Sequence, residues 1–223
     1  MLVNKAHRYE LKPNRKQLIL LKKHAGCARF AWNRGLAERI KLWEQKGKTT
    51  NAIEQHRELN RLKKTNCPWM YEVSKCAPQE SLRDLDRAFK NFFDGRANFP
   101  KFKKKGIHDS FRLTGAIKVL PKHVQLPRLG KVRVKETTAK FKGKVLSATV
   151  SREADRWYVS LAVEVEIPDP LPVQGKPVGI DIKGGTVKWV MRIPQLRRCD
   201  ARRAAPCTAA GWQRGIRKEV VAG

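Results

Sequence analysis

One segment near the middle of the chain interleaves aromatic side chains with cations, a pattern suited to phosphates and bases. We call it the basic loop, residues 96–106, and it reads Arg96-Ala97-Asn98-Phe99-Pro100-Lys101-Phe102-Lys103-Lys104-Lys105-Gly106. Cations neutralise phosphates, and exposed aromatic rings stack on bases. The nucleic-acid contacts predicted here are Arg96, Lys101, Lys103, Lys104, Lys105 and, a little later, Arg112. For the two phenylalanines, anchoring to the core is favoured over stacking.

A second basic surface is predicted on the helix that begins after Pro13. Three cations fall outside its apolar stripe and are candidate nucleic-acid contacts: Lys22, Lys23 and Arg29. An ordinary amphipathic helix with its lysines in water explains the same pattern. A helix-turn-helix would need a second helix a few residues later, and Gly35 permits such a turn.

The cysteines and histidines show no metal-binding spacing. Cys199 and Cys207 are the closest pair of the five cysteines, and no histidine lies near them. A zinc ribbon or knuckle needs pairs separated by about two residues. We therefore predict no zinc site in this chain. An odd number of scattered cysteines also favours a reducing compartment over a disulfide scaffold.

Asp181 is the sharpest candidate for catalysis, because it stands inside the apolar run 178–182, Val-Gly-Ile-Asp-Ile. Burying an unpaired ionised carboxylate is costly. Metal-dependent nucleases with an RNase-H-like sheet hold Mg²⁺ from an acidic residue on the first strand, so Asp181 is predicted as a catalytic residue and metal ligand. An aspartate that faces water from an edge strand is the alternative.

The elements that must position these residues divide the chain into a helical and a stranded part. Residues 5–12 read as a strand, and Asn14 with Gln17 has the spacing of a capping box. Helices are predicted from residue 14, over 36–44, over 52–63 and from Pro78 to 94. The apolar stripe of the first is Leu18, Leu21, Ala25, Ala28 and Trp32, and that of the last is Leu82, Leu85, Phe89 and Phe92.

After residue 95 the period of the apolar positions changes. Residues 95–115 read as loop and 117–167 as strands, the longest of which puts Trp157, Val159, Leu161 and Val163 on one face. Prolines make 168–177 a stiff linker. A strand follows at 178–183. Residues 184–223 have no sustained period and predict an irregular, disordered tail.

Charge is the strongest signal in the composition. The 223 residues carry 49 Lys and Arg against 20 Asp and Glu, a formal net charge of +29, with a hydrophobic fraction of 41% that is typical of a folded protein. A protein this basic favours a polyanionic partner, and nucleic acid is the commonest one. The sequence offers no apolar run long enough to cross a membrane and no apolar stretch at its start that reads as a secretory signal.

In order along residues 3–183, the segments resemble the OrfB/TnpB family of transposon-encoded, RNA-guided proteins, relatives of type V CRISPR effectors. The blocks that carry the resemblance are Tyr9–Pro13 with Cys27–Asn33, Pro68–Val73, Leu82–Phe93, Phe99–Gly106, Asp109–Arg112 and Gly179–Asp181. The resemblance implies an α+β fold. A wedge-like β-barrel would combine residues 1–13 with strands of 95–167. A helical recognition lobe, 14–94, would be inserted between them, and a RuvC-like nuclease domain would start at 178–183.

The resemblance also implies function. Family members bind a guide RNA from the transposon end, recognise a short motif beside the target and cut DNA with Mg²⁺ held by a carboxylate cluster. Here the match ends after Ile182, and the only later acids are Asp200 and Glu219. The sequence thus predicts a truncated member with a vestigial Asp181, an incomplete metal site and no cleavage by this chain alone.

Three functions stay open at this stage. The first is a transposon-associated protein that binds guide RNA and target DNA without cutting. The second is an active endonuclease completed by a separate polypeptide, and the third is a general RNA-binding protein. The expected location is the cytoplasm of a prokaryote, at the nucleoid and not in a membrane.

Overall fold

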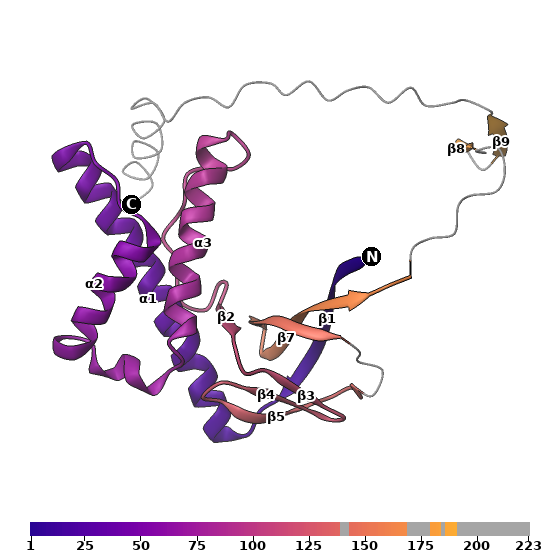
Figure 1. Ribbon diagram of the computed structural model, residues 1–223, viewed down its shortest axis with the longest axis horizontal. Coiled ribbons are helices and arrows are strands. Elements are labelled where there is room, and N and C mark those ends of the chain that lie inside the picture. The colour runs from indigo at the N-terminus through magenta and orange to yellow at the C-terminus, as the bar shows by residue number, and fades with distance from the viewer. Residues whose placement is uncertain (139–142, 169–178, 184–185, 191–223) are drawn as a thin grey trace. The chain divides into compact units, whose positions relative to one another are not determined.

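The computed structural model describes residues 1–138, 143–168, 179–183 and 186–190 (Figure 1). The chain has a main part, Leu2–Glu166, and a separate two-stranded hairpin. The main part contains helices and an antiparallel sheet, so the predicted α+β class is confirmed. Within the described residues, no helix is long and apolar enough to cross a membrane.

The first helix, α1, is longer than the sequence predicted. It runs without a break over Arg15–Lys46, so the separate helix predicted over 36–44 is wrong, and no turn interrupts α1 at Gly35. Its start is as predicted: the Asn14 side chain accepts from the Gln17 amide and the Gln17 side chain from the Asn14 amide. It ends at Gly47, whose φ of 59° is left-handed.

Gly35 lies inside α1 because neighbouring side chains leave no room for a larger residue. A Cβ atom at this position would lie 2.8 Å from Leu82 Cδ2 and 3.0 Å from Leu85 Cδ2. Both leucines are buried in α3, Cys76–Phe93. The close approach of α1 and α3 therefore outweighs the intrinsic cost of glycine in a helix.

We expect Gly35→Ala to lower the free energy of unfolding by about 1 to 2 kcal/mol, because overpacking outweighs the better helix propensity of alanine. Gly26→Ala is the matched control in the same helix. A Cβ at Gly26 meets only the Arg29 side chain, at 3.9 Å, so that change should stabilise by about 0.5 to 1 kcal/mol. Urea unfolding measures both, and equal effects at the two sites would contradict the packing explanation.

α1 contributes to three hydrophobic clusters, one of which joins Cys27 and Ala31 to residues of the helix α2, Ala52–Thr65, and a short 3-10 helix, η1, Pro68–Glu72. The first half of α1 packs Leu21, Ala25 and Ala28 against the sheet. Its second half packs Trp32 and Leu36 with residues of α3. The helices α2 and η1 complete the helical lobe. Figure 1 shows α1, α2 and α3 beside one another.

The sheet of the main part has seven antiparallel strands in the order β2-β6-β7-β1-β5-β4-β3. Their bounds are β1 Leu2–Lys12, β2 Ser110–Thr114, β3 Lys118–Leu120, β4 His123–Leu126, β5 Gly130–Val134, β6 Lys144–Glu153 and β7 Arg156–Glu166. The edge strands β2 and β3 do not pair, so the sheet is not closed into the predicted β-barrel. Only residues 115–117 join them, which brings the two edges together at one corner.

The inner face of the sheet follows the predicted alternation on β7, where Trp157, Val159, Leu161 and Val163 are buried. On β6 the register shifts between Val145 and Ser147. This bulge leaves Leu146 exposed and turns Ala148 inward. One cluster joins buried residues from both halves of the sheet, which shows that the sheet curls around a common core.

The hairpin consists of β8, Gly179–Lys183, and β9, Thr186–Val190. They pair antiparallel, with Asp181 opposite Lys188. β9 lies inside 184–223, where the sequence predicted no regular structure. Two glycines between runs of β-forming residues, Gly184-Gly185, are a sequence signal for a hairpin that the prediction did not use. The linker 168–177, apart from Pro168, and the rest of the expected tail lie outside the described residues.

Candidate nucleic-acid interface

The basic loop is anchored to the helical lobe by an aromatic cluster. Phe99 is buried, and its ring meets those of Phe89 and Phe92 edge-on, at centroid distances of 5.6 and 5.3 Å. Edge-to-face pairs at such distances are favourable beyond the area that they bury. The expected anchoring role is therefore correct for Phe99, whereas Phe102 is exposed.

Trp32 of α1 holds the loop in two ways. Its indole Nε1 donates to the Lys101 carbonyl at 2.9 Å, and its ring lies 3.9 Å from the Lys103 ammonium. Burial lowers the pKa of Lys103, an effect that the nearby Asp84 partly offsets. A half-buried ammonium on an indole face is a structural cation. Lys103 therefore differs from the other lysines of the predicted contact set.

Several other predicted contacts are engaged in ion pairs within the protein. Arg29 binds Asp109 at 2.6 Å, and both side chains are mostly buried. Arg112 on β2 lies 3.4 Å from Asp84 on α3. These two pairs connect the segment that follows the basic loop to the helical lobe. Exposed pairs join Arg96 to Asp94 and Lys23 to Glu72.

Four of the predicted contacts are exposed and have no ionic partner within the described part of the protein. Lys22, Lys101, Lys104 and Lys105 are exposed, and their ammonium groups have no ionic partner among the residues that the structure describes. Three of them lie in the basic loop. An exposed lysine keeps its hydration until a phosphate approaches, which makes it a good electrostatic contact.

A cleft of about 1000 Å³ lies between α2, η1, α3 and two turns of the sheet. It is lined by five cations, which are Lys63, Lys64, Lys75, Arg83 and Arg128. The one acid in its wall, Glu80, is already bound by Arg83 at 2.7 Å. Amide side chains of Asn60 and Gln79 also face it. No local sequence signal marks this cleft, because its walls come from separate stretches of the chain.

The interior of the cleft wall is strongly positive. Lys63 is only 7% exposed, and no acidic side chain among the residues that the structure describes pairs with it. The pKa of His56 is lowered, mainly by burial and further by Lys63, Arg83 and Lys75. Its Nε2 is buried without a hydrogen bond. Such an environment attracts an anion.

Arg128 occupies the turn between β4 and β5 with a φ of 66°. Non-glycine residues rarely adopt this left-handed conformation. Turns between antiparallel strands use this conformation, and Ala154 in the turn between β6 and β7 adopts it too, with a φ of 49°. The turn places Arg128 in the wall of the cleft.

Buried His24 of α1 fixes the segment that enters the cleft wall. Its Nδ1–H donates to the Leu20 carbonyl at 2.8 Å, and its Nε2 accepts from the Ser74 amide at 3.0 Å. Ser74 and Lys75 line the cleft. Acceptance at Nε2 requires the neutral ring. Burial lowers the pKa of His24, and the Leu20 bond partly opposes that shift.

We therefore expect stability to fall as the pH drops below the ordinary histidine pKa of about 6.5. Below that pH, His24 of the unfolded chain binds a proton more readily than buried His24 of the folded protein. The contribution of His24 to stability is therefore complete above about pH 6.5 and is lost as the pH falls toward the lowered pKa of the folded state. Thermal unfolding between about pH 7.5 and 5 measures the slope. His24→Gln should reduce the slope and leave the part due to His56. Identical slopes in both proteins would exclude His24 as the source.

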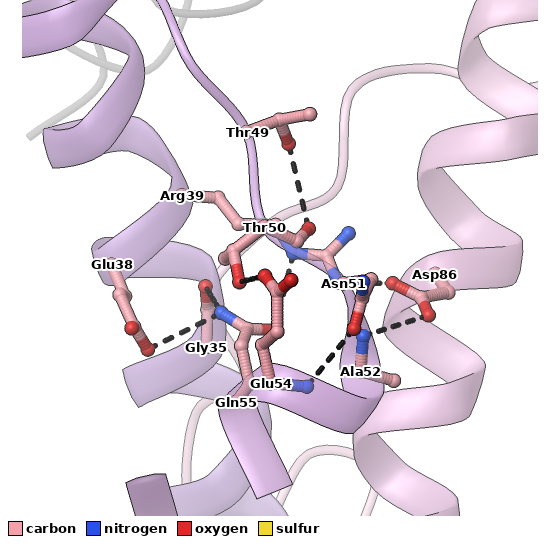
Figure 2. Close-up of polar contacts among 10 residues, drawn as sticks. All are labelled: Gly35, Glu38, Arg39, Thr49, Thr50, Asn51, Ala52, Glu54, Gln55 and Asp86. Atoms are coloured by element: carbon pink, nitrogen blue, oxygen red, sulfur yellow. Dashed lines mark hydrogen bonds and ion pairs between the residues drawn. The ribbon is translucent and has the colours of Figure 1, made fainter. Parts of the chain in front are cut away.

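A buried polar network, missed by the sequence analysis, joins the three helices (Figure 2). Arg39 is 3% exposed, pairs with Asp86 and donates to Gln55 Oε1 at 3.1 Å. Asp86 also accepts from the Ala52 amide at the start of α2, at 2.9 Å. Gln55 donates to the Gly35 carbonyl at 2.8 Å. This network fixes how α2 and α3, two walls of the cleft, meet α1.

Asp181 lies on β8 of the hairpin, and the metal site predicted at this residue stays a prediction. Across the β8–β9 ladder its partner is Lys188, a cation. Among the described residues, no three of the types His, Cys, Asp and Glu come together as ligands. A two-metal centre needs several converging carboxylates.

The chain is similar to a family model in its amino-terminal part and to curated proteins over most of its length. The family model HTH_OrfB_IS605, described as a helix-turn-helix domain, matches residues 1–48. In this chain those residues form β1 and the whole of one continuous helix, α1, with no turn between two helices.

Two curated relatives extend the similarity. "Putative RNA-guided DNA endonuclease InsQ" of Escherichia coli K12 is 34% identical over 179 residues, 79% of this chain and 44% of the relative. "Putative RNA-guided DNA endonuclease" of Streptomyces pristinaespiralis is 30% identical over 194 residues, 80% of this chain and 46% of the relative. The chain thus spans less than half the length of these relatives.

Proposed function

Because the chain belongs to the OrfB/TnpB family of transposon-encoded proteins, we propose that it is a nucleic-acid-binding protein that uses the basic loop and the cationic cleft. The observation that carries the proposal is the cleft. Five cations line it and its single acid is already paired. Phosphate groups neutralise such a surface with release of counterions.

We propose different parts for the two surfaces. The exposed lysines of the basic loop hold the backbone through charge alone. In the cleft, the side-chain amides of Asn60 and Gln79 stand among the cations, and carboxamides can pair with base edges. The cleft therefore suits a partner whose bases are accessible, and the loop suits any phosphate backbone.

The partners that we propose are a guide RNA and its DNA target, in line with the printed names of the relatives. Such binding would place the protein at the nucleoid. For a polypeptide of residues 1–223 we propose binding without cleavage, because only Asp200 and Glu219 follow Asp181 in its sequence. A second polypeptide that supplies carboxylates, and RNA binding without a guide, are the competing functions.

One experiment separates these functions. We expect Lys64→Ala with Lys75→Ala in the cleft to weaken binding of RNA and duplex DNA and to reduce the salt slope by about 2. Lys5→Ala with Lys144→Ala is the matched control, since both lysines are exposed on the sheet outside the cleft. Fluorescence anisotropy measures the affinities.

The same samples test cleavage. With Mg²⁺ and the RNA that co-purifies from the host, target DNA should stay intact, and Asp181→Ala should leave binding unchanged. Cutting that Asp181→Ala abolishes would overturn the proposal of binding alone. Equal affinity for the co-purified RNA and for random RNA would favour a general RNA-binding protein.

A further inference from the structure

The basic loop has no regular secondary structure between residue 95 and β2, yet α1 holds it at several points. The firmest is Asn33. Its Nδ2 donates to the Lys103 carbonyl at 3.0 Å, and its Oδ1 accepts from the Lys103 amide at 2.8 Å. One side chain thus satisfies both backbone groups of one loop residue, as a neighbouring β-strand would.

A carboxamide suits this pair of bonds, because it carries a donor and an acceptor in one plane. The residues around Asn33 act on the same stretch of loop. Trp32 binds the Lys101 carbonyl and supports the Lys103 ammonium, and Arg29 binds Asp109. Side chains of α1 therefore bind the chain both before and after the exposed lysines Lys104 and Lys105.

We propose that Asn33 is a positioning residue for nucleic-acid binding: it latches the basic loop to α1, so that Lys101, Lys104 and Lys105 are presented in one arrangement before the ligand arrives. This inference rests on the proposed function. A ligand that finds its contacts already ordered does not spend affinity on ordering them. When the competent arrangement is populated only in part, the apparent affinity falls by that fraction.

The latch predicts a specific combination of results for Asn33→Ala and for Asn33→Leu, which has a similar shape but makes neither hydrogen bond. In the free protein, the Lys103 amide should exchange with deuterium faster, while amides in the middle of α1 are unchanged. Affinity for a single-stranded RNA should fall roughly five- to ten-fold. The salt slope should stay the same, because every phosphate-binding cation is still present.

Two controls separate positioning from other roles. Asn98→Ala removes an asparagine of the same loop that is exposed and has no hydrogen bond to another described residue, and it should change neither readout. Lys104→Ala with Lys105→Ala should lower the salt slope without faster exchange at Lys103. Unfolding curves establish that each variant is folded before its affinity is compared.

Binding by the wild-type chain is measured first, and its absence would overturn the proposed function itself. With binding established, unchanged exchange at Lys103 in both Asn33 variants would show that Asn33 is no latch. Faster exchange with affinity within two-fold of wild type would show that the order of the loop does not matter for binding. Either result overturns the positioning role and leaves the proposed function standing.

Discussion

RNA binding by this protein should weaken by about 10³ to 10⁵ when salt is raised from about 50 to 200 mM, if roughly six to ten phosphates are neutralised. The physical reason is the formal charge of +29 together with the positive cleft and the exposed lysines of the basic loop. Released counterions gain less entropy when the solution already contains many ions. Anisotropy titrations at four or five salt concentrations give the slope.

The structure also predicts which lysines set that slope. Replacing Lys101, Lys104 and Lys105 with alanine should flatten it by about 2, because each removes one phosphate contact worth about 0.7 of slope on single strands. Lys103→Ala should leave the slope nearly unchanged, since its ammonium lies on the Trp32 ring. A loss of slope for Lys103→Ala as large as for Lys104→Ala would show that Lys103 contacts phosphate directly.

Sequence reasoning found the elements with strong local signals. The capping box at Asn14, the buried stripe through Leu85 and Phe89, and the alternation along β7 are properties of a few neighbouring residues, and the structure confirms them. Gly35 misled the prediction because its local preference is to break a helix. Close contacts with Leu82 and Leu85, which are distant in sequence, explain why glycine occupies this position inside the helix.

The surroundings of the candidate interface could not be predicted from the sequence for the same reason. Composition shows how many cations exist, but their partners are set by the fold. Arg29 meets Asp109 across 80 positions of sequence, so no pattern around Arg29 could show that its charge is engaged. The cleft was missed entirely, because Lys63, Lys75 and Arg128 belong to separate elements that meet only in the folded chain.

Phe89→Ala should lower the free energy of unfolding by about 3 to 5 kcal/mol. Phe89 is 4% exposed, and its ring contacts Phe99 edge-on and lies 5.0 Å from the Arg39 guanidinium. Removing the ring leaves a cavity between α3 and the root of the basic loop. It also removes one side of the packing around the buried Arg39 guanidinium, which pairs with the partly exposed Asp86. Urea unfolding measures this loss of stability when the wild-type and variant curves are fitted with one shared dependence of free energy on urea concentration.

Phe102→Ala makes the same chemical change at an exposed site of the loop, 43% exposed, and should cost less than about 0.5 kcal/mol. The contrast between the two phenylalanines tests whether the aromatic cluster is a core or a surface. A cost below about 1 kcal/mol for Phe89→Ala would mean that the cluster opens readily. The basic loop would then lose its anchor at Phe99, and its lysines would be ordered only by the nucleic acid that they bind.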